Sequence, residues 1–223
     1  MISFNLDELA TKVITQLNNL IPVRDAYHLH GHSYRGLHQS SKGVDGTIPY
    51  ESGLSRDGLR MFDLASQVVM IVSEPFTMEY RLDGEFLTYT PDYLLHLRDG
   101  RRAVVEIKWK KDADSEYNQR RFKAIREVLE AADVLFAVFS EDILRSPILQ
   151  RNMSLLERHR HRIISPMVVG QILGHLRLGN MRLGELVRRI GCRHTVLAVL
   201  AQGLIATDLR KTDLTDASLV RRA

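Results

Sequence analysis

The chain has 223 residues, of which 44% are hydrophobic and 26% charged, and its formal net charge is +4. These values are typical of one medium-sized globular domain, alone or with a small second one, and the mild positive charge permits nucleic-acid binding without requiring it. The single cysteine excludes an internal disulfide framework, and no stretch approaches the roughly 20 apolar residues of a membrane span. No signal-peptide pattern opens the chain, so we expect a cytoplasmic protein without membrane contact.

The N-terminal part combines a helix with a polar stretch. Apolar residues at helical spacing predict an amphipathic helix over residues 4–20, ended by Pro22. Residues 23–50 are polar, Gly-rich and basic, and Lys42 is their candidate phosphate contact. Three alternating imidazoles occur there, at His28, His30 and His32. Because no fourth ligand is evident, we interpret the stretch as a solvated loop rather than a metal site.

A helix is predicted from about Glu51, and a short apolar strand follows at Val68–Val72. Two further strands are predicted at Phe76–Leu82 and Phe86–Leu97. The pair Asp83-Gly84 between them is typical of a tight hairpin turn. This order of elements predicts an antiparallel arrangement that begins after the helix.

The next hairpin carries the chemistry. The strand Phe86–Leu97 is joined through the turn Asp99-Gly100 to a strand over Ala103–Trp109. Side chains alternate between the faces of a strand, so Glu106 and Lys108 share one face and apolar residues the other. Asp92, which lies on the preceding strand, brings a second acid to the neighbourhood.

Two carboxylates on adjacent strands, with a lysine alongside, form an oxygen site for a hard divalent cation. The residues therefore outline a metal-dependent phosphodiesterase. The alternative is a solvent-facing hairpin edge with a surface ion pair.

The rest of the chain predicts the end of one domain and a second small one. Residues 115–132 are an amphipathic helix, and residues 134–139 a strand buried on both faces, which completes an α/β core. A basic run follows that includes Arg158 and Arg160, interpreted as a solvated helix face or linker with phosphate contact as the alternative.

Three short helices and two extended segments after Pro166 predict a winged helix-turn-helix, in which Arg193 and His194 are the candidate DNA contacts. Its third helix is poor in polar residues, so docking to a protein partner is an equal alternative to DNA recognition. The predicted organisation is an N-terminal helix (1–22), a domain that carries the acidic hairpin (23–150), a basic linker (151–165) and a winged-helix domain (166–223).

The spacing Pro91-Asp92, then Glu106-Ile-Lys108, resembles the PD-(D/E)xK signature of a large nuclease superfamily. The resemblance implies a restriction-endonuclease-like core in which Asp92 and Glu106 hold Mg²⁺ or Mn²⁺. It also implies that Lys108 orients or activates the attacking water. The resemblance further implies that the domain 23–150 is an endonuclease domain.

Three further features narrow the resemblance: the Gly36 to Tyr50-Glu-Ser approach, the helix leading into Val68-Val69 and Glu74-Pro-Phe, and the appended winged helix. Together they resemble the TnsA-type endonucleases of heteromeric cut-and-paste transposons. In those systems such a protein cleaves at the 5′ ends of the element, beside a DDE transposase, and an ATPase regulates both. The resemblance thus implies double-stranded DNA as substrate and these two proteins as partners, while the oligomeric state stays open.

The pattern departs from the family at one acid. The family places a glutamate in a Ser-x-Leu-Glu arrangement on the first core helix, where this chain reads Ser52-Gly-Leu-Ser55. Glu51 lies one turn earlier on the expected helix, and we interpret it as the substitute metal ligand and catalytic acid. The alternative is a degenerate site.

Two other functions therefore remain open from the sequence. One is a stand-alone restriction or repair nuclease of the same superfamily. The other is a non-catalytic nuclease fold that acts as a DNA- or partner-binding assembly subunit.

Overall fold

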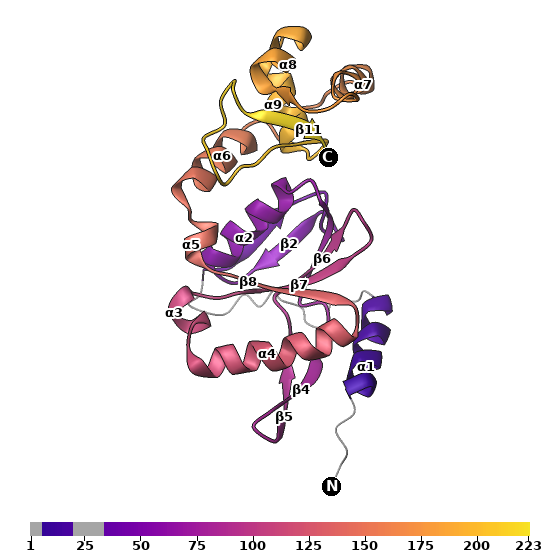
Figure 1. The fold of residues 1–223 in the computed structure, drawn as a ribbon, viewed down its shortest axis with the longest axis vertical. Helices are drawn as coiled ribbons and strands as arrows, with labels where there is room; N and C mark the ends of the chain where they lie inside the picture. The colour runs from indigo at the N-terminus through magenta and orange to yellow at the C-terminus, as the bar shows by residue number, and fades with distance from the viewer. Residues whose placement is uncertain (1–5, 20–33) are drawn as a thin grey trace. The chain divides into compact units, whose positions relative to one another are not determined.

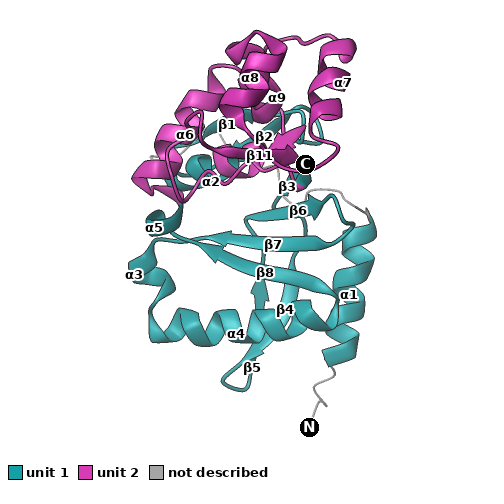
Figure 2. Ribbon diagram, turned by 45° about the horizontal axis from the view of Figure 1, so that its top comes forward, with its two compact units in different colours: residues 1–59, 68–143 teal, residues 60–67, 144–223 magenta. Residues whose placement is uncertain are grey.

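The computed structural model describes residues 6–19 and 34–223, which form two compact units. Unit 1 comprises residues up to 59 together with 68–143, and unit 2 comprises 60–67 together with 144–223 (Figure 2). The three histidines of the predicted loop, His28, His30 and His32, lie outside the described residues. Among the helices that the structure describes, none has the length and apolarity that crossing a membrane requires.

A four-stranded sheet organises unit 1. Its strands lie in the order β3 (Val68–Ser73), β6 (Tyr93–Leu97), β7 (Arg102–Ile107) and β8 (Val134–Phe139). The first three run antiparallel to their neighbours, whereas β8 pairs in parallel with β7. A parallel neighbour needs a crossover connection, and α4 (Glu116–Ala131) provides it. The mixed α/β class predicted from the sequence is therefore confirmed.

One face of the sheet is covered by α4 and by α1 (Leu6–Asn19), as Figure 1 shows. Helix α4 begins where the side chain of Ser115 accepts a hydrogen bond from the backbone N–H of Asn118, which caps the free amides of the first turn. Its apolar stripe packs on Leu94 and Val104 at the centre of the sheet. This cluster is a hydrophobic core of unit 1.

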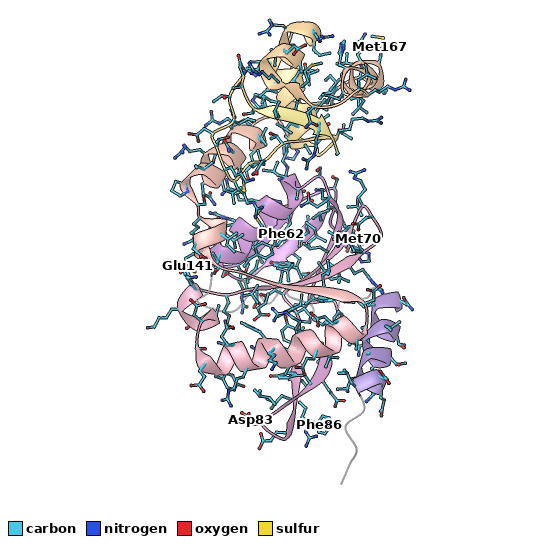
Figure 3. The ribbon with its side chains drawn as sticks, viewed as in Figure 1. Phe62, Met70, Asp83, Phe86, Glu141 and Met167 are labelled. Carbon is cyan, nitrogen blue, oxygen red and sulfur yellow. The ribbon has the colours of Figure 1, made fainter. Side chains whose placement is uncertain are left out.

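A separate hairpin, β4 (Met78–Leu82) and β5 (Glu85–Tyr89), packs against the same helices. Its predicted turn is confirmed, since Asp83 and Gly84 both have positive φ. Figure 3 shows Asp83 and Phe86 at the tip of this hairpin, and Phe86 is exposed there. The base of the hairpin, in contrast, is buried and ends close to the candidate site.

The opposite face of the sheet carries α2 (Gly53–Leu64) and the hairpin of β1 (Gly36–Gln39) and β2 (Thr47–Tyr50), as Figure 1 shows. The polar stretch 23–50 was predicted as a loop, so this hairpin is a correction. The helix also starts later than predicted, because Ser52 caps it and leaves Glu51 outside.

Two strand predictions need correction as well. The strand predicted over Phe86–Leu97 is divided into β5 and β6, which belong to different sheets. Pro91 lies at the division, and a proline has no N–H to continue a strand ladder. The strand β8, predicted as buried on both faces, is an edge strand on which Leu135 is 44% exposed.

Unit 2 is built from four helices and three short strands. The helices are α6 (Pro147–Glu157), α7 (Pro166–His175), α8 (Leu183–Ile190) and α9 (Arg193–Ala201). The strands are β9 (Met181–Arg182), β10 (Ile205–Ala206) and β11 (Leu219–Arg222), in the order β10-β11-β9. The short helices α3 (Lys110–Ala113) and α5 (Glu141–Leu144) complete the chain. The three helices and the extended segments predicted after Pro166 are all present.

The stretch 151–165, predicted as a basic linker or solvated helix face, belongs mostly to α6 and the turn that follows. Met153 and Leu156 are buried in the core of unit 2, together with Leu64 from the end of α2. Arg60, on the same end of α2, donates to both carboxylate oxygens of Glu157 at 2.6 and 2.8 Å. Residues 60–67 are therefore an integral part of unit 2.

Candidate active site

Two carboxylates meet where β6 begins and β7 ends. The register of this antiparallel pair, with Tyr93 opposite Val105, brings Asp92 alongside Glu106 and Ile107. The backbone N–H of Ile107 donates to Asp92 Oδ2 at 2.6 Å, so the strand itself holds the carboxylate. The two acids predicted from the sequence are thus brought together by the pairing of neighbouring strands.

Glu106 lies on a central strand and is only 5% exposed. Its Oε2 accepts a hydrogen bond from the Tyr89 hydroxyl at 2.9 Å, and its Oε1 lies 3.6 Å from the Lys108 ammonium. The Lys108 side chain is about one-third exposed, so it joins the buried acid to solvent. This burial argues against a solvent-facing hairpin edge with a surface ion pair.

The site concentrates negative charge in a partly dry environment. Burial, followed by the charge of Glu106, raises the pKa of Asp92 from 3.8 to about 7. The Ile107 hydrogen bond and the Lys108 charge oppose this rise, and the charge of Glu74 adds to it. The charge of Glu106 next to the buried Asp92 is one that a bound cation would neutralise.

The donor set fits a magnesium ion. Mg²⁺ is commonly held by one or two carboxylates and keeps several of its waters, and Asp92 and Glu106 provide that number. Within the described residues, no group of three or more His, Cys, Asp or Glu side chains is arranged to hold a metal. A third protein ligand would therefore need a side chain that moves closer.

Glu51 and Ser55 have different surroundings from those that the sequence predicts. Ser52 caps α2 by accepting from the backbone N–H of Ser55, and the two hydroxyls are 2.8 Å apart. Glu51 precedes this cap, is about half exposed and lies 3.4 Å from Arg35. The expected relation of one helical turn between Glu51 and Ser55 does not exist, and the role of Glu51 as a ligand stays a prediction.

Ser55 is nevertheless connected to the site region by a hydrogen bond with Tyr93. The Tyr93 hydroxyl donates to the carbonyl oxygen of Pro49 at 3.2 Å. Burial and the charge of Asp92 raise the pKa of the Tyr93 phenol, whereas a hydrogen bond with Ser55 lowers it. Ser55 is thus linked to the residue next to Asp92 and carries no charge itself.

Sequence reasoning missed Glu74 as a site residue. It directly follows β3, its backbone N–H donates to the Asp92 carbonyl at 3.0 Å, and its charge contributes to the pKa of Asp92. Its φ is +40°, which is uncommon for a residue other than glycine and typical of constrained positions. The only signal for Glu74 in the sequence is the Glu74-Pro-Phe stretch, which contributes to the resemblance but indicates no role.

The five predicted DNA contacts differ in how far they are exposed and in the residues to which they are bonded. Arg160 Nη1 lies 2.6 Å from Asp63 Oδ2 in a nearly buried pair, and Arg193 is bonded to Asp216. Lys42 is half-buried, and its carbonyl accepts from the Ile71 N–H at 2.8 Å. These three contribute to structure within their own units.

The two remaining predicted contacts are exposed, at Arg158 and His194. The His194 ring centroid lies 5.1 Å from that of His159, which sequence reasoning missed. Burial, then the positive charges of His194, Arg162 and Arg158, lower the pKa of His159. We call these four residues, Arg158, His159, Arg162 and His194, the α9 basic cluster, since they gather at the start of that helix.

Residues 65–141 match the family model described as TnsA-like endonuclease N terminal. The matched stretch contains β3 to β8 and with them Asp92, Glu106 and Lys108. The resemblance predicted from the sequence is confirmed over these residues. A search of curated proteins gave no match to the chain.

Proposed function

On the premise that residues 65–141 are a TnsA-like endonuclease domain, we propose that this chain is the metal-dependent DNA endonuclease of a cut-and-paste transposon. The observation that carries the proposal is the pair of carboxylates on β6 and β7, with Lys108 at the exposed side of Glu106. In the proposed role the chain cleaves at the 5′ ends of the element. A DDE transposase and an ATPase regulator would be its partners.

The core that supports this chemistry is of the PD-(D/E)xK type in our proposal. Asp92 and Glu106 would hold Mg²⁺ or Mn²⁺, which when bound polarises the scissile phosphate and lowers the pKa of water. The Ile107 N–H fixes the orientation of Asp92, so its carboxylate needs little reorganisation. Lys108 offsets the negative charge that develops on the phosphate and positions the nucleophile.

The third acid is better assigned to Glu74 than to Glu51. Glu74 is bonded through its backbone to the Asp92 carbonyl, and its charge acts on Asp92. Glu51 faces Arg35 and is about half exposed. We therefore propose that Glu74 supplies the charge that position 55 lacks, either to the metal or to its water.

A nicking assay tests the proposal. The purified chain should convert supercoiled plasmid carrying transposon ends to nicked product with Mg²⁺ or Mn²⁺, and EDTA should stop it. The assay is run with and without the proposed transposase and ATPase and scores cleavage at the 5′ ends only, because a DDE transposase itself cuts DNA. Undiminished cleavage by Asp92→Asn in that mixture would contradict the assignment of this site.

For unit 2 we propose a winged helix that contacts DNA phosphates or a partner and does not read bases. A recognition helix needs an exposed polar face, but residues 196–201 of α9 are all buried. Only the first residues of the helix, next to the α9 basic cluster, reach the surface. Sequence recognition would then belong to a partner such as the transposase.

Binding measurements distinguish this role from sequence recognition. The full chain should bind transposon-end DNA and unrelated DNA of equal length within a few-fold of each other, with strong salt dependence. A preference for the end sequence of a thousand-fold or more would mean that this chain reads bases.

A further inference from the structure

Tyr89 connects the candidate site to the core of unit 1. It is the last residue of β5, pairs with Met78 of β4 and is 2% exposed. The amino-acid sequence does not indicate a role for Tyr89, because the strand predicted over Phe86–Leu97 contains several aromatic and apolar residues and nothing distinguishes this one. Its hydroxyl, however, donates to Glu106 Oε2 at 2.9 Å.

Residues of two elements pack against the ring of Tyr89. The Phe136 ring of β8 meets it edge-on, with centroids 6.4 Å apart and an interplanar angle of 89°. The Arg121 guanidinium of α4 lies over it at 5.3 Å from the centroid, and Arg121 Nε also donates to the Tyr80 hydroxyl at 3.2 Å. A phenol with a guanidinium over its ring and a second aromatic ring packed edge-on against it has few rotamers available.

The Tyr89 hydroxyl holds one of the two carboxylate oxygens of Glu106, because it donates to Oε2 at 2.9 Å. Glu106 Oε2 is thereby fixed, while Oε1 is left on the side of Lys108.

We propose that Tyr89 is a positioning residue that presents Glu106 Oε1 to a divalent cation. The inference rests on the proposed metal-dependent nuclease function and adds a residue to it. Lys108 is partly exposed and has a flexible side chain, so it can move away from Oε1 when a cation arrives. Tyr89 is buried and cannot move away. It therefore holds Oε2 of Glu106, while Oε1 is free to coordinate the cation. Hydrogen bonds of this kind to a ligand carboxylate change metal affinity by roughly 10- to 100-fold.

The test compares Tyr89→Phe with Tyr80→Phe in the full-length protein. Both variants lose one buried hydroxyl and keep the ring, but only Tyr89 is bonded to Glu106, whereas Tyr80 is bonded to Arg121. Mn²⁺ binding is measured by electron paramagnetic resonance on the protein without DNA, alongside the melting temperature. We expect Tyr89→Phe to bind Mn²⁺ roughly 10- to 100-fold more weakly, and Tyr80→Phe to bind it within about two-fold of the unaltered protein.

Cleavage as a function of Mn²⁺ concentration gives a second measurement. With Tyr89→Phe, the half-saturating Mn²⁺ concentration should rise by the same factor, and the maximal rate should recover at high metal. Unchanged Mn²⁺ affinity in Tyr89→Phe, or an equal loss in both variants, would overturn the inference, since the hydroxyl would then be structural only.

Asp92→Ala separates this inference from the proposed function. If Asp92→Ala no longer binds Mn²⁺ and Tyr89→Phe binds it normally, the site is correct and the role of Tyr89 is wrong. If Asp92→Ala binds Mn²⁺ as the unaltered protein does, the proposed site is wrong, and the inference about Tyr89 fails with it.

Discussion

The backbone N–H of Ile107 and the Oδ2 atom of Asp92 are 2.6 Å apart, so the strand that carries Glu106 also sets the position of the other acid. An asparagine at position 92 keeps an oxygen acceptor for this N–H but has no charge. The charge of the site can therefore be removed without moving the side chain.

Asp92→Asn should lower metal-dependent cleavage by at least about a thousand-fold, or about 4 kcal/mol in the barrier, because the amide is a poor ligand for Mg²⁺. Lys108→Met should lower it as well, since no cation then offsets the phosphate charge. Both variants should keep the circular dichroism spectrum of the unaltered protein. Arg101→Ala, at the distant turn of the same hairpin, is the control and should cleave normally.

The raised pKa of Asp92 predicts how the stability of the unaltered protein depends on pH. The folded pKa of Asp92 is about 7 against an ordinary 3.8, raised by burial and by Glu106. Between those values the folded state keeps a proton that the unfolded state has released, so the free energy of unfolding falls as pH rises from about 4 to about 7.

Asp92→Asn removes this loss and should raise the free energy of unfolding of the metal-free protein at pH 8 by roughly 1–3 kcal/mol. Urea denaturation with EDTA should show a smaller difference between the two proteins at pH 5. A difference that does not grow between pH 5 and pH 8 would mean that Asp92 is ionised throughout.

Three substitutions decide which acid completes the site. Glu74→Gln should reduce cleavage at saturating Mn²⁺ by roughly 10- to 1,000-fold, because the charge of Glu74 acts on Asp92. Glu51→Gln should have little effect, because Glu51 is about half exposed and faces Arg35. Ser55→Glu tests whether the family's glutamate can be restored. A rate increase with Ser55→Glu, and no change with the other two, would show that the site of this chain is degenerate.

Arg160 and Arg158 should behave differently when each is replaced. Breaking the nearly buried Arg160–Asp63 pair by Arg160→Met leaves a buried carboxylate and should cost roughly 2–4 kcal/mol of stability. Arg158→Ala should leave the melting temperature unchanged. It should reduce the slope of log affinity for DNA against log salt concentration by about 1, as expected for one lost phosphate contact. The reverse pattern would exchange the roles of the two arginines.

Local patterns predicted most of the fold. The turns at Asp83-Gly84 and Asp99-Gly100, helix α4 and the helices of unit 2 all follow from signals within a few residues. The PD…ExK spacing likewise predicted that Asp92, Glu106 and Lys108 lie together. The turn at Asp99-Gly100 fixes the register of β6 against β7, which places the two acids side by side.

The sequence-based predictions were wrong where the structure depends on contacts between residues far apart in the chain. Pro91 marks a point where the predicted strand 86–97 can be interrupted, but the sheet that each half joins depends on strands elsewhere in the chain. Glu74 reaches the site through a positive φ that only its surroundings stabilise. The charged pairs of Arg160 and Arg193 involve acids far away in the sequence, so both arginines looked like free surface cations.

Residues 60–67 have a consequence for protein engineering. Leu64 is buried in the core of unit 2, and Arg60 and Asp63 form ion pairs with Glu157 and Arg160, so unit 2 is made from two separate stretches of chain. A chimera that exchanges only the C-terminal segment for that of a relative would join a foreign core to native positions 60–67. Grafts of this unit should therefore carry both stretches, and a library that recombines at one junction should yield mainly insoluble hybrids.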